Sequence, residues 1–270
     1  MNHERVFDRL RVSAGTKVRL RNWDPAETLE CGSRDELQDR LEENLKRLFD
    51  LQYALFAENR RSVLVVLQGM DAGGKDGTIR HVISAFNPQG CRVTSFKAPA
   101  GEEAAHDFLW RVHRVAPARG EVGVFNRSHY EDVLVVRVRG LAPRGVWGKR
   151  FQHINEFERM LADHGVTVLK FYLHISKGEQ KKRLLERTKD PTKLWKANPM
   201  DFDDRRYWDQ YMKAYEDVLS TCSTEWAPWF IIPADHKWFR NYAVSEILVR
   251  AMQRLDLRIP KPKVHTSFAE

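Results

Sequence analysis

Residues Val63 to Val82 read VLVVLQGMDAGGKDGTIRHV, and this stretch decides the fold. Its first residues are apolar and rich in valine, without the polar alternation of a half-exposed strand. Such a run is typical of a strand that is covered on both faces. A glycine-rich turn follows, and its spacing from Gly69 to Lys75 fits the phosphate-loop pattern G-x-x-x-x-G-K. The stretch therefore predicts a buried strand, a phosphate-binding loop and then a helix from Lys75 to about Phe86.

The glycine turn has the chemistry of an anion site. Glycines let successive backbone N–H groups turn inward, and the N-terminus of the following helix adds positive potential. Lys75 brings a full positive charge to the bound phosphates. The alternative is a turn that binds nothing, but the strand, the spacing, the lysine and the helix all agree on a phosphate site. The loop residues expected to contact phosphate or nucleotide are Gly69, Ala72, Gly73, Gly74, Asp76, Gly77 and Thr78.

Asp71 is an unexpected residue in such a loop. A carboxylate beside several phosphate charges is repulsive, at a cost of roughly several kcal/mol in a partly dry site. A divalent cation between carboxylate and phosphate removes this conflict, and Mg²⁺ favours few carboxylates together with substrate oxygens. Asp71 is therefore a candidate metal ligand for Mg²⁺, with Mn²⁺ as a substitute. The alternative is a turn residue that hydrogen-bonds its own backbone.

A second polar segment, FNRSHYED, follows the third predicted strand. Ligands of open α/β sheets bind at this carboxyl edge. Asn126 stands where many nucleotide-binding strands end in aspartate, which supports moving the metal carboxylate to Asp71. Arg127 is placed to form paired hydrogen bonds with phosphate oxygens, with a surface salt bridge as the alternative. Asp132 is a candidate second metal ligand. Glu131 is either a ligand-binding residue or the partner of Ser128 in a helix capping box.

A third, basic cluster follows the fourth predicted strand. Arg183 and Arg187 are four residues apart, on one face of a predicted helix. Lys193 and Lys196 follow Pro191 and flank Trp195, which would either stack on a base or pack. A charge run of this kind is often only a solvated surface. Its place after the fourth strand instead favours a mobile lid, about residues 177–215, whose cations would neutralise transition-state charge.

Strand-like and helical segments alternate along the chain, so the predicted fold is α/β with five parallel strands flanked by helices. The division expected is an N-terminal arm and helix at 1–58, a P-loop domain at 59–260 and a loose tail at 261–270. The arm is expected to have little core of its own.

The helix that follows is capped by Ser33. Its leucines either pack on the protein's own sheet or form a dimer seam: Leu37, Leu41, Leu45, Leu48, Leu51 and Leu55. The other expected helices span about 101–116, 128–138, 146–165, 201–223 and 242–255.

Composition and charge indicate which classes of partner and compartment to expect. The net charge is +8 and the pI is near 9.4, which favours an anionic partner. No apolar run approaches the roughly 18 residues of a membrane span, and the N-terminus does not look like a signal peptide, so a cytoplasmic protein is expected. Three widely spaced cysteines predict buried free thiols rather than a disulfide framework.

The three segments together resemble the second family of polyphosphate kinases, whose fold is a P-loop kinase related to thymidylate kinase. GMDAGGKDGTIRHV resembles the family's Walker A region, FNRSHYEDVLVVRV its Walker B region, and residues 181–211 its lid. The resemblance runs from about Leu37 to Leu255. It implies transfer of a phosphoryl group from inorganic polyphosphate to a nucleotide with Mg²⁺, often by dimers or tetramers. The form FNRSHYEDV resembles the third subgroup, which acts on both AMP and ADP.

The resemblance assigns catalytic roles to Asp71, Lys75, Arg127, Arg183 and Arg187, and the departure at Asn126 directs metal binding to Asp71 and Asp132. Adenine nucleotides are the expected acceptors, with guanine nucleotides as a second group. Four further cations either belong to a polyphosphate groove or are ordinary surface charges: Arg80, Lys97, Arg111 and Arg114. The rival functions are an ATP-dependent kinase and, with less support, a nucleic-acid-binding protein. Neither a nucleic acid nor a membrane is an expected partner.

Overall fold

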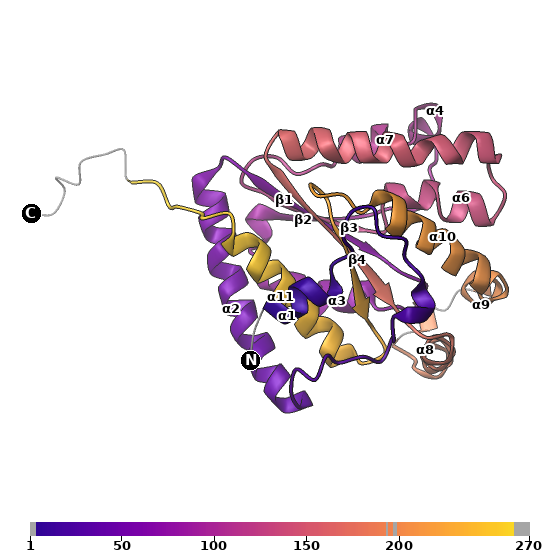
Figure 1. The fold of residues 1–270 in the computed structure, drawn as a ribbon, viewed down its shortest axis with the longest axis horizontal. Coiled ribbons are helices and arrows are strands. Elements are labelled where there is room, and N and C mark those ends of the chain that lie inside the picture. The colour runs from indigo at the N-terminus through magenta and orange to yellow at the C-terminus, as the bar shows by residue number, and fades with distance from the viewer. Residues whose placement is uncertain (1–3, 193, 197–198, 262–270) are drawn as a thin grey trace, which may run out of the picture.

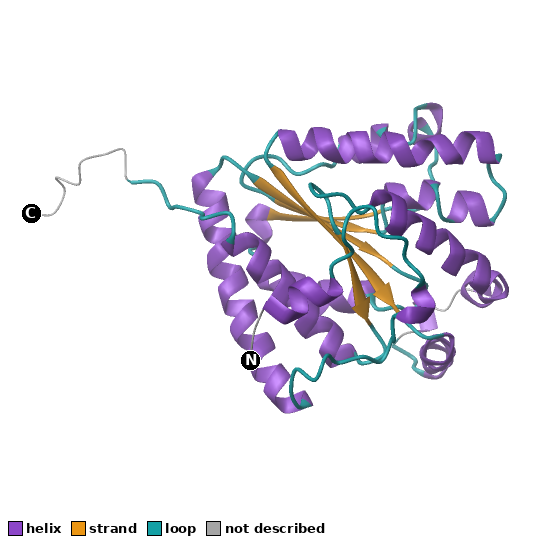
Figure 2. Cartoon of the chain, viewed as in Figure 1, coloured by secondary structure: helices purple, strands orange, loops and turns teal. Residues whose placement is uncertain are grey.

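The computed structural model describes residues 4–192, 194–196 and 199–261. Five parallel strands form one twisted sheet in the order β2-β3-β1-β4-β5 (Figure 2). This confirms the predicted fold class. The central strand is buried along its whole length, as the valine-rich run predicted. The strands are β1 (Ser62–Gln68), β2 (Cys91–Ser95), β3 (Val122–Asn126), β4 (Val166–His174) and β5 (Trp229–Pro233).

Helices cover both faces of the sheet (Figure 1). One group lies on the side of the chain termini: α1 (Glu4–Leu10), α2 (Arg34–Glu58), α3 (Lys75–His81) and α11 (Lys237–Gln253). The other side carries α6 (Val135–Val138), α7 (Arg144–Asp163) and α10 (Trp208–Cys222). Four further helices come after β2 and β4 along the chain: α4 (Glu102–Ala105), α5 (Trp110–His113), α8 (Lys177–Lys189) and α9 (Pro199–Asp204). No helix in the described part of the chain is both long and apolar enough to cross a membrane.

Several helices are shorter than predicted. The segment 101–116 is two short helices, since the Asp107 carboxylate accepts hydrogen bonds from the Leu109 and Trp110 backbone and starts a new turn. The segment 201–223 is broken by a 3₁₀ turn at Arg205–Tyr207. The helix predicted to run to Phe86 ends at His81, and the one predicted from residue 128 begins as a 3₁₀ turn.

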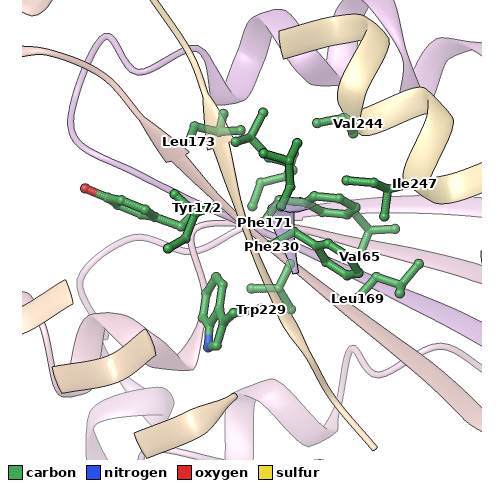
Figure 3. Close-up of a cluster of buried hydrophobic side chains, with 14 of the residues drawn as sticks. Val65, Leu169, Phe171, Tyr172, Leu173, Trp229, Phe230, Val244 and Ile247 are labelled. Atoms are coloured by element: carbon green, nitrogen blue, oxygen red, sulfur yellow. The ribbon is translucent and has the colours of Figure 1, made fainter. Parts of the chain in front are cut away.

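The core lies on both faces of the sheet (Figure 3). Alternate residues of β4 and β5 point to opposite sides, as the period of a strand requires. Phe171 and Phe230 stack with ring centroids 5.6 Å apart on the side of α11, where Ile247 lies. Tyr172 and Trp229 point to the other face.

The N-terminal arm contributes directly to this common core. Val6, Phe7 and Leu10 of α1 are buried, and Phe7 meets Phe230 edge-on at 5.0 Å. The Val12 N–H donates to the Trp229 carbonyl at 2.8 Å, next to an antiparallel bridge between Arg11 and Phe230. The arm thereby covers β5, the edge strand, whose backbone groups would otherwise be exposed. The division of the chain at residue 58 stays a prediction.

The leucine helix packs within its own chain. Ser33 and Glu36 form the capping box at its start, which confirms the predicted N-cap. Leu37, Leu41 and Leu48 are buried, and α2 packs mainly against α11 rather than on the sheet itself. The alternative of a leucine dimer seam is therefore wrong. The outer face of α2 carries an aromatic stripe instead: Phe49, Tyr53 and Phe56, which are 48%, 56% and 49% exposed.

A charged network lies buried beneath the segment that follows β3. Lys170 of β4 forms an ion pair with Glu158 of α7, and both side chains are fully buried. The Tyr130 hydroxyl donates to Glu158 at 2.8 Å and accepts from Lys170 at 2.9 Å. His129 lies 3.2 Å from the same carboxylate. The network fixes residues 129 and 130 against the sheet, and these residues adjoin Arg127 and Glu131.

Candidate active site

A cavity of about 810 Å³ opens at the carboxyl edge of the sheet, where the phosphate-loop motif lies. Its walls come from the loop and α3, the ends of β2 and β3, helix α8 and the start of α11. Predicted site residues that line it are Asp71, Ala72, Gly74, Lys75, Asp76, Gly77, Asn126, Arg127, Arg183 and Arg187. The structure thus brings together residues from all three motifs that the sequence singled out.

The loop needs its glycines for two physical reasons. Gly74 has φ +111°, in a backbone region that favours glycine, and α3 begins at the next residue. At Gly69 a side chain would place its Cβ 2.8 Å from the Leu173 carbonyl oxygen. Gly69 and Gly73 shape the loop behind the cavity wall, since neither is among the residues that line the cavity. Ala72 has φ +61°, a strained conformation for a residue with a side chain.

Lys75 lies at the first position of α3 and is 8% exposed. Its ammonium group donates to the carbonyl oxygens of Gly69 and Met70 at 2.5 and 3.2 Å. Burial, assisted by the nearby charge of Arg127, lowers the pKa of Lys75. An anionic ligand in the cavity would counter both effects, which fits the predicted contact with phosphate.

Asp71 and Arg127, which both line the cavity, form an ion pair. The Arg127 guanidinium donates to the Asp71 carboxylate at 2.6 Å and lies 3.8 Å from Glu131. Arg127 also has φ +60°, so its backbone is held in a strained conformation. Burial raises the pKa of Glu131, although Arg127 and Lys75 oppose the shift. The two predicted motifs are therefore in direct electrostatic contact.

Glu131 does not cap a helix. The Ser128 hydroxyl accepts from the Tyr130 N–H and from the Gln68 amide, so the capping box weighed from the sequence is not formed. Glu131 instead belongs to the charge cluster around Lys75 and Arg127. The cap alternative is wrong because a 3₁₀ turn, rather than an α-helix, follows Ser128.

Asp76 and Asn126 form a second polar pair in the cavity. The Asn126 amide donates to the Asp76 carboxylate at 3.0 Å. The described residues hold no cluster of three or more His, Cys, Asp or Glu side chains suited to a metal. Mg²⁺ in phosphate-transfer sites needs only one or two carboxylates, because phosphate and water supply the other ligands. Asp71, Asp76 and the Asn126 amide oxygen fit a metal held in that way.

Asp132 lies apart from this group. Arg150 donates to its carboxylate at 3.0 Å, and Arg111 lies 3.9 Å away. Burial raises the pKa of Asp132, and the two arginines oppose the shift. Asp132 is not among the residues that line the cavity. Its role as a metal ligand stays a prediction, and its arginine partners favour a positioning role.

Side chains of helix α8 donate hydrogen bonds to the backbone of the phosphate loop. Arg183 is buried, and its guanidinium donates to the carbonyls of Ala72, Ala234 and Asp235. The Gln180 amide donates to the Asp71 carbonyl at 3.0 Å. The first turns of the predicted lid are thus anchored to the loop backbone, while Arg187 and Trp195 line the cavity beyond them. Lys193 and the side chain of Lys196 lie outside the described residues.

Other predicted residues separate into two groups. Arg80 and Lys97 line the cavity, as expected for a polyphosphate groove. Arg111 and Arg114 do not, because they pair with Glu103 and Glu102 on the short helices beyond β2. Thr78 is fully buried behind the loop and is not among the cavity residues.

Sequence reasoning missed the contribution of α11. Lys237, Arg240 and Asn241 line the cavity, and His81 of α3 lies with them. The signal was present, since these residues follow the fifth strand directly and so reach the same edge of the sheet.

A parallel sheet, a glycine loop with its lysine at a helix N-terminus and a cation-lined cavity together define a P-loop phosphotransferase. The polyphosphate kinase 2 (PPK2) family model matches residues 32–259. The chain belongs to this family.

Relatives cover nearly the whole chain. The AMP/ADP-polyphosphate phosphotransferase of Meiothermus ruber is 52% identical over 255 residues, which are 94% of this chain and 95% of that protein. The ADP-polyphosphate phosphotransferase of Rhodopseudomonas palustris is 44% identical over 263 residues, which are 93% of this chain and 91% of that protein. The crystal structure of polyphosphate kinase 2 from Arthrobacter aurescens TC1 superposes with a TM-score of 0.94 at 43% identity, covering 97% of this chain and 94% of that one.

Proposed function

We propose that this chain is a polyphosphate-dependent nucleotide kinase that acts on ADP and on AMP. An oxygen of the acceptor's terminal phosphate forms a bond to the terminal phosphorus of inorganic polyphosphate. The bridging P–O bond to the rest of the chain breaks, and the donor leaves one phosphate shorter. The reaction is reversible, and ADP becomes ATP.

The observation that carries this proposal is the charge of the cavity. Three acidic side chains line it: Asp71, Asp76 and Glu186. Eight basic ones surround them: Lys75, Arg80, Lys97, Arg127, Arg183, Arg187, Lys237 and Arg240. Such an excess suits a polyanionic donor together with a nucleotide acceptor, whose mutual repulsion must be screened before they can react. The name of the Meiothermus ruber relative supports the same donor and both acceptors, and that of the Rhodopseudomonas palustris relative supports the donor and ADP.

Positioning and electrostatics supply most of the rate in phosphoryl transfer. Lys75 and the loop N–H groups would hold the donor phosphates. Arg127 of the second motif pairs with Asp71 of the loop and would stabilise charge on the transferred group. Arg183 would act indirectly, because its hydrogen bonds to loop and strand carbonyls keep the loop in place. Mg²⁺, held by Asp71 with Asp76 or Asn126, would supply further neutralisation of phosphate charge.

A donor test distinguishes this function from its nearest rival, an ATP-dependent kinase. The purified protein receives Mg²⁺, polyphosphate as the only donor, and either AMP or ADP, and the products are separated by ion-exchange chromatography. We expect ATP from ADP, and ADP followed by ATP from AMP. ATP from ADP alone would retain the reaction and discard the wider acceptor range. No transfer from polyphosphate, with transfer from ATP to another acceptor, would refute the proposal.

We further propose that the protein is cytoplasmic and that it forms a homo-oligomer through the aromatic stripe Phe49, Tyr53 and Phe56. These side chains recur at helical spacing on the outer face of α2, and a second copy of the same stripe would bury them. Replacing Tyr53 with aspartate should reduce the mass measured by light scattering to that of one chain. A Phe202→Asp variant, also at an exposed aromatic residue, is the control. An unchanged mass for Tyr53→Asp would refute this interface.

A further inference from the structure

Arg240 is a buried cation that lies directly against the phosphate loop. It is 2% exposed, yet it is among the residues that line the cavity. A Cβ added at Gly74 would lie 1.9 Å from one terminal nitrogen of its guanidinium, and one added at Gly77 would lie 2.9 Å from the other. The guanidinium therefore occupies the space left open by Gly74, the N-cap of α3, and by Gly77 in the first turn of this helix.

No carboxylate balances this charge within the described residues. The guanidinium donates through Nε and Nη2 to the neutral amide oxygen of Asn241, at 3.2 and 2.8 Å. No described Asp or Glu forms an ion pair with Arg240. Burial lowers the pKa of Arg240 to about 10, and Arg183 adds to the shift. A buried charge without an opposite charge is costly, so the site is arranged to receive an anion.

The surrounding cations extend from this position toward solvent. Lys237 lies one turn earlier on the same face of α11 and is exposed. Arg80 of α3 is exposed on the same cavity. A buried arginine at the loop and exposed cations farther out match a linear polyanion that enters from the surface. The sugar and base of a nucleoside triphosphate would bring no negative charge to these outer cations.

We propose that Arg240 is a polyphosphate-binding residue, which holds a donor phosphate behind the one being transferred, and that Lys237 holds the next part of the chain. This proposal rests on the proposed function. It explains how one side of the cavity favours polyphosphate over a nucleoside triphosphate as donor. The acceptor nucleotide makes no contact with Arg240 in this arrangement.

The test measures binding of polyphosphate alone, without nucleotide and without turnover, at several salt concentrations. Arg240→Gln should weaken binding about tenfold or more, as expected for loss of a charged hydrogen bond. By analogy with nucleic acids, the slope of log K against log salt should decrease by about 0.7 to 0.9 for each lost cation contact. Lys237→Gln should show the same change in slope. Arg254→Gln, an exposed residue just beyond the same helix, makes an equal change in net charge and should leave the slope unaltered.

Kinetics separate this role from a purely structural one. Arg240→Gln should raise the KM for polyphosphate and leave the KM for ADP unchanged, and Arg240→Lys should restore part of the affinity. An unchanged polyphosphate affinity and salt slope in Arg240→Gln would overturn the proposal. If Arg240→Gln does not fold, the exposed Lys237→Gln variant decides, and an unchanged slope there also overturns it. A protein that shows the expected slopes but makes no ATP would refute the proposed function and leave this inference standing.

Discussion

Replacing Asp71 with asparagine is expected to lower kcat by about 10²- to 10³-fold, the size of effect seen when one preorganised electrostatic group is lost from an active site. Binding of polyphosphate should persist, because the variant removes a negative charge from a cavity that holds a polyanion. Asp71 and Arg127 both line the cavity, and the Arg127 guanidinium donates to the Asp71 carboxylate at 2.6 Å. Asparagine keeps the shape of this contact but cannot balance the guanidinium or hold Mg²⁺ as a carboxylate does.

Glu186→Gln is the matched control for this experiment. Glu186 lies in the same cavity and is also a carboxylate, but it is exposed on α8 and has no part in the proposed metal site. A much smaller effect on kcat in Glu186→Gln would show that position, and not net charge, matters. Single-turnover rates and polyphosphate affinity should be measured for both variants. A kcat for Asp71→Asn close to that of the wild type would refute the role given to this carboxylate.

Replacing Glu158 with alanine is expected to lower the free energy of unfolding by about 3–5 kcal/mol, because it leaves the buried Lys170 ammonium without its opposite charge. Total stability of a domain is only about 5–15 kcal/mol, so this is a large fraction. For a chain near this size, each kcal/mol shifts Tm by about 2–4 °C. Thermal and urea unfolding would measure the loss.

A double variant separates the lost charge from the lost volume. Glu158→Leu combined with Lys170→Met removes both charges and fills much of the space, so it should recover most of the stability. Glu158→Leu alone should be as unstable as the alanine variant. Equal destabilisation of the single and double variants would show that the hydrogen bonds of Tyr130 and His129, rather than the ion pair, stabilise this region.

The same network predicts how stability depends on pH. Burial alone would raise the pKa of Glu158, but Lys170 and His129 lower it below its ordinary value of 4.5. A depressed carboxyl pKa contributes stability that is present above the unfolded-state pKa and is lost as the pH falls through the folded-state pKa. The wild type should therefore lose stability below about pH 4.3, and the Glu158→Leu/Lys170→Met variant should lose less over the same range.

Local patterns in the sequence were sufficient for the elements nearest the chemistry. The valine-rich run and the G-x-x-x-x-G-K spacing predicted β1, the loop and the start of α3, because steric demands on backbone and burial on both faces leave few residue choices there. The Ser33 N-cap was predicted for the same reason, since the hydrogen bonds of a cap form within four residues; the structure adds the return bond from Glu36. The lengths of several helices were wrong, and within residues 101–116 the cause is the Asp107 carboxylate, which accepts from two backbone N–H groups and starts a new turn.

The parallel α/β sheet, the phosphate loop and the family to which the chain belongs could be predicted from the sequence, because these depend on periodicity and on local motifs. Which charges meet became known only from the folded chain. In the folded chain Asp71 pairs with Arg127, which is 56 residues away, and Asp132 pairs with Arg150. Arg183 donates to backbone carbonyls, and Arg240 lies against the loop. Pairing of this kind depends on distances between elements far apart in the chain, and the spacing of residues along a sequence does not contain those distances.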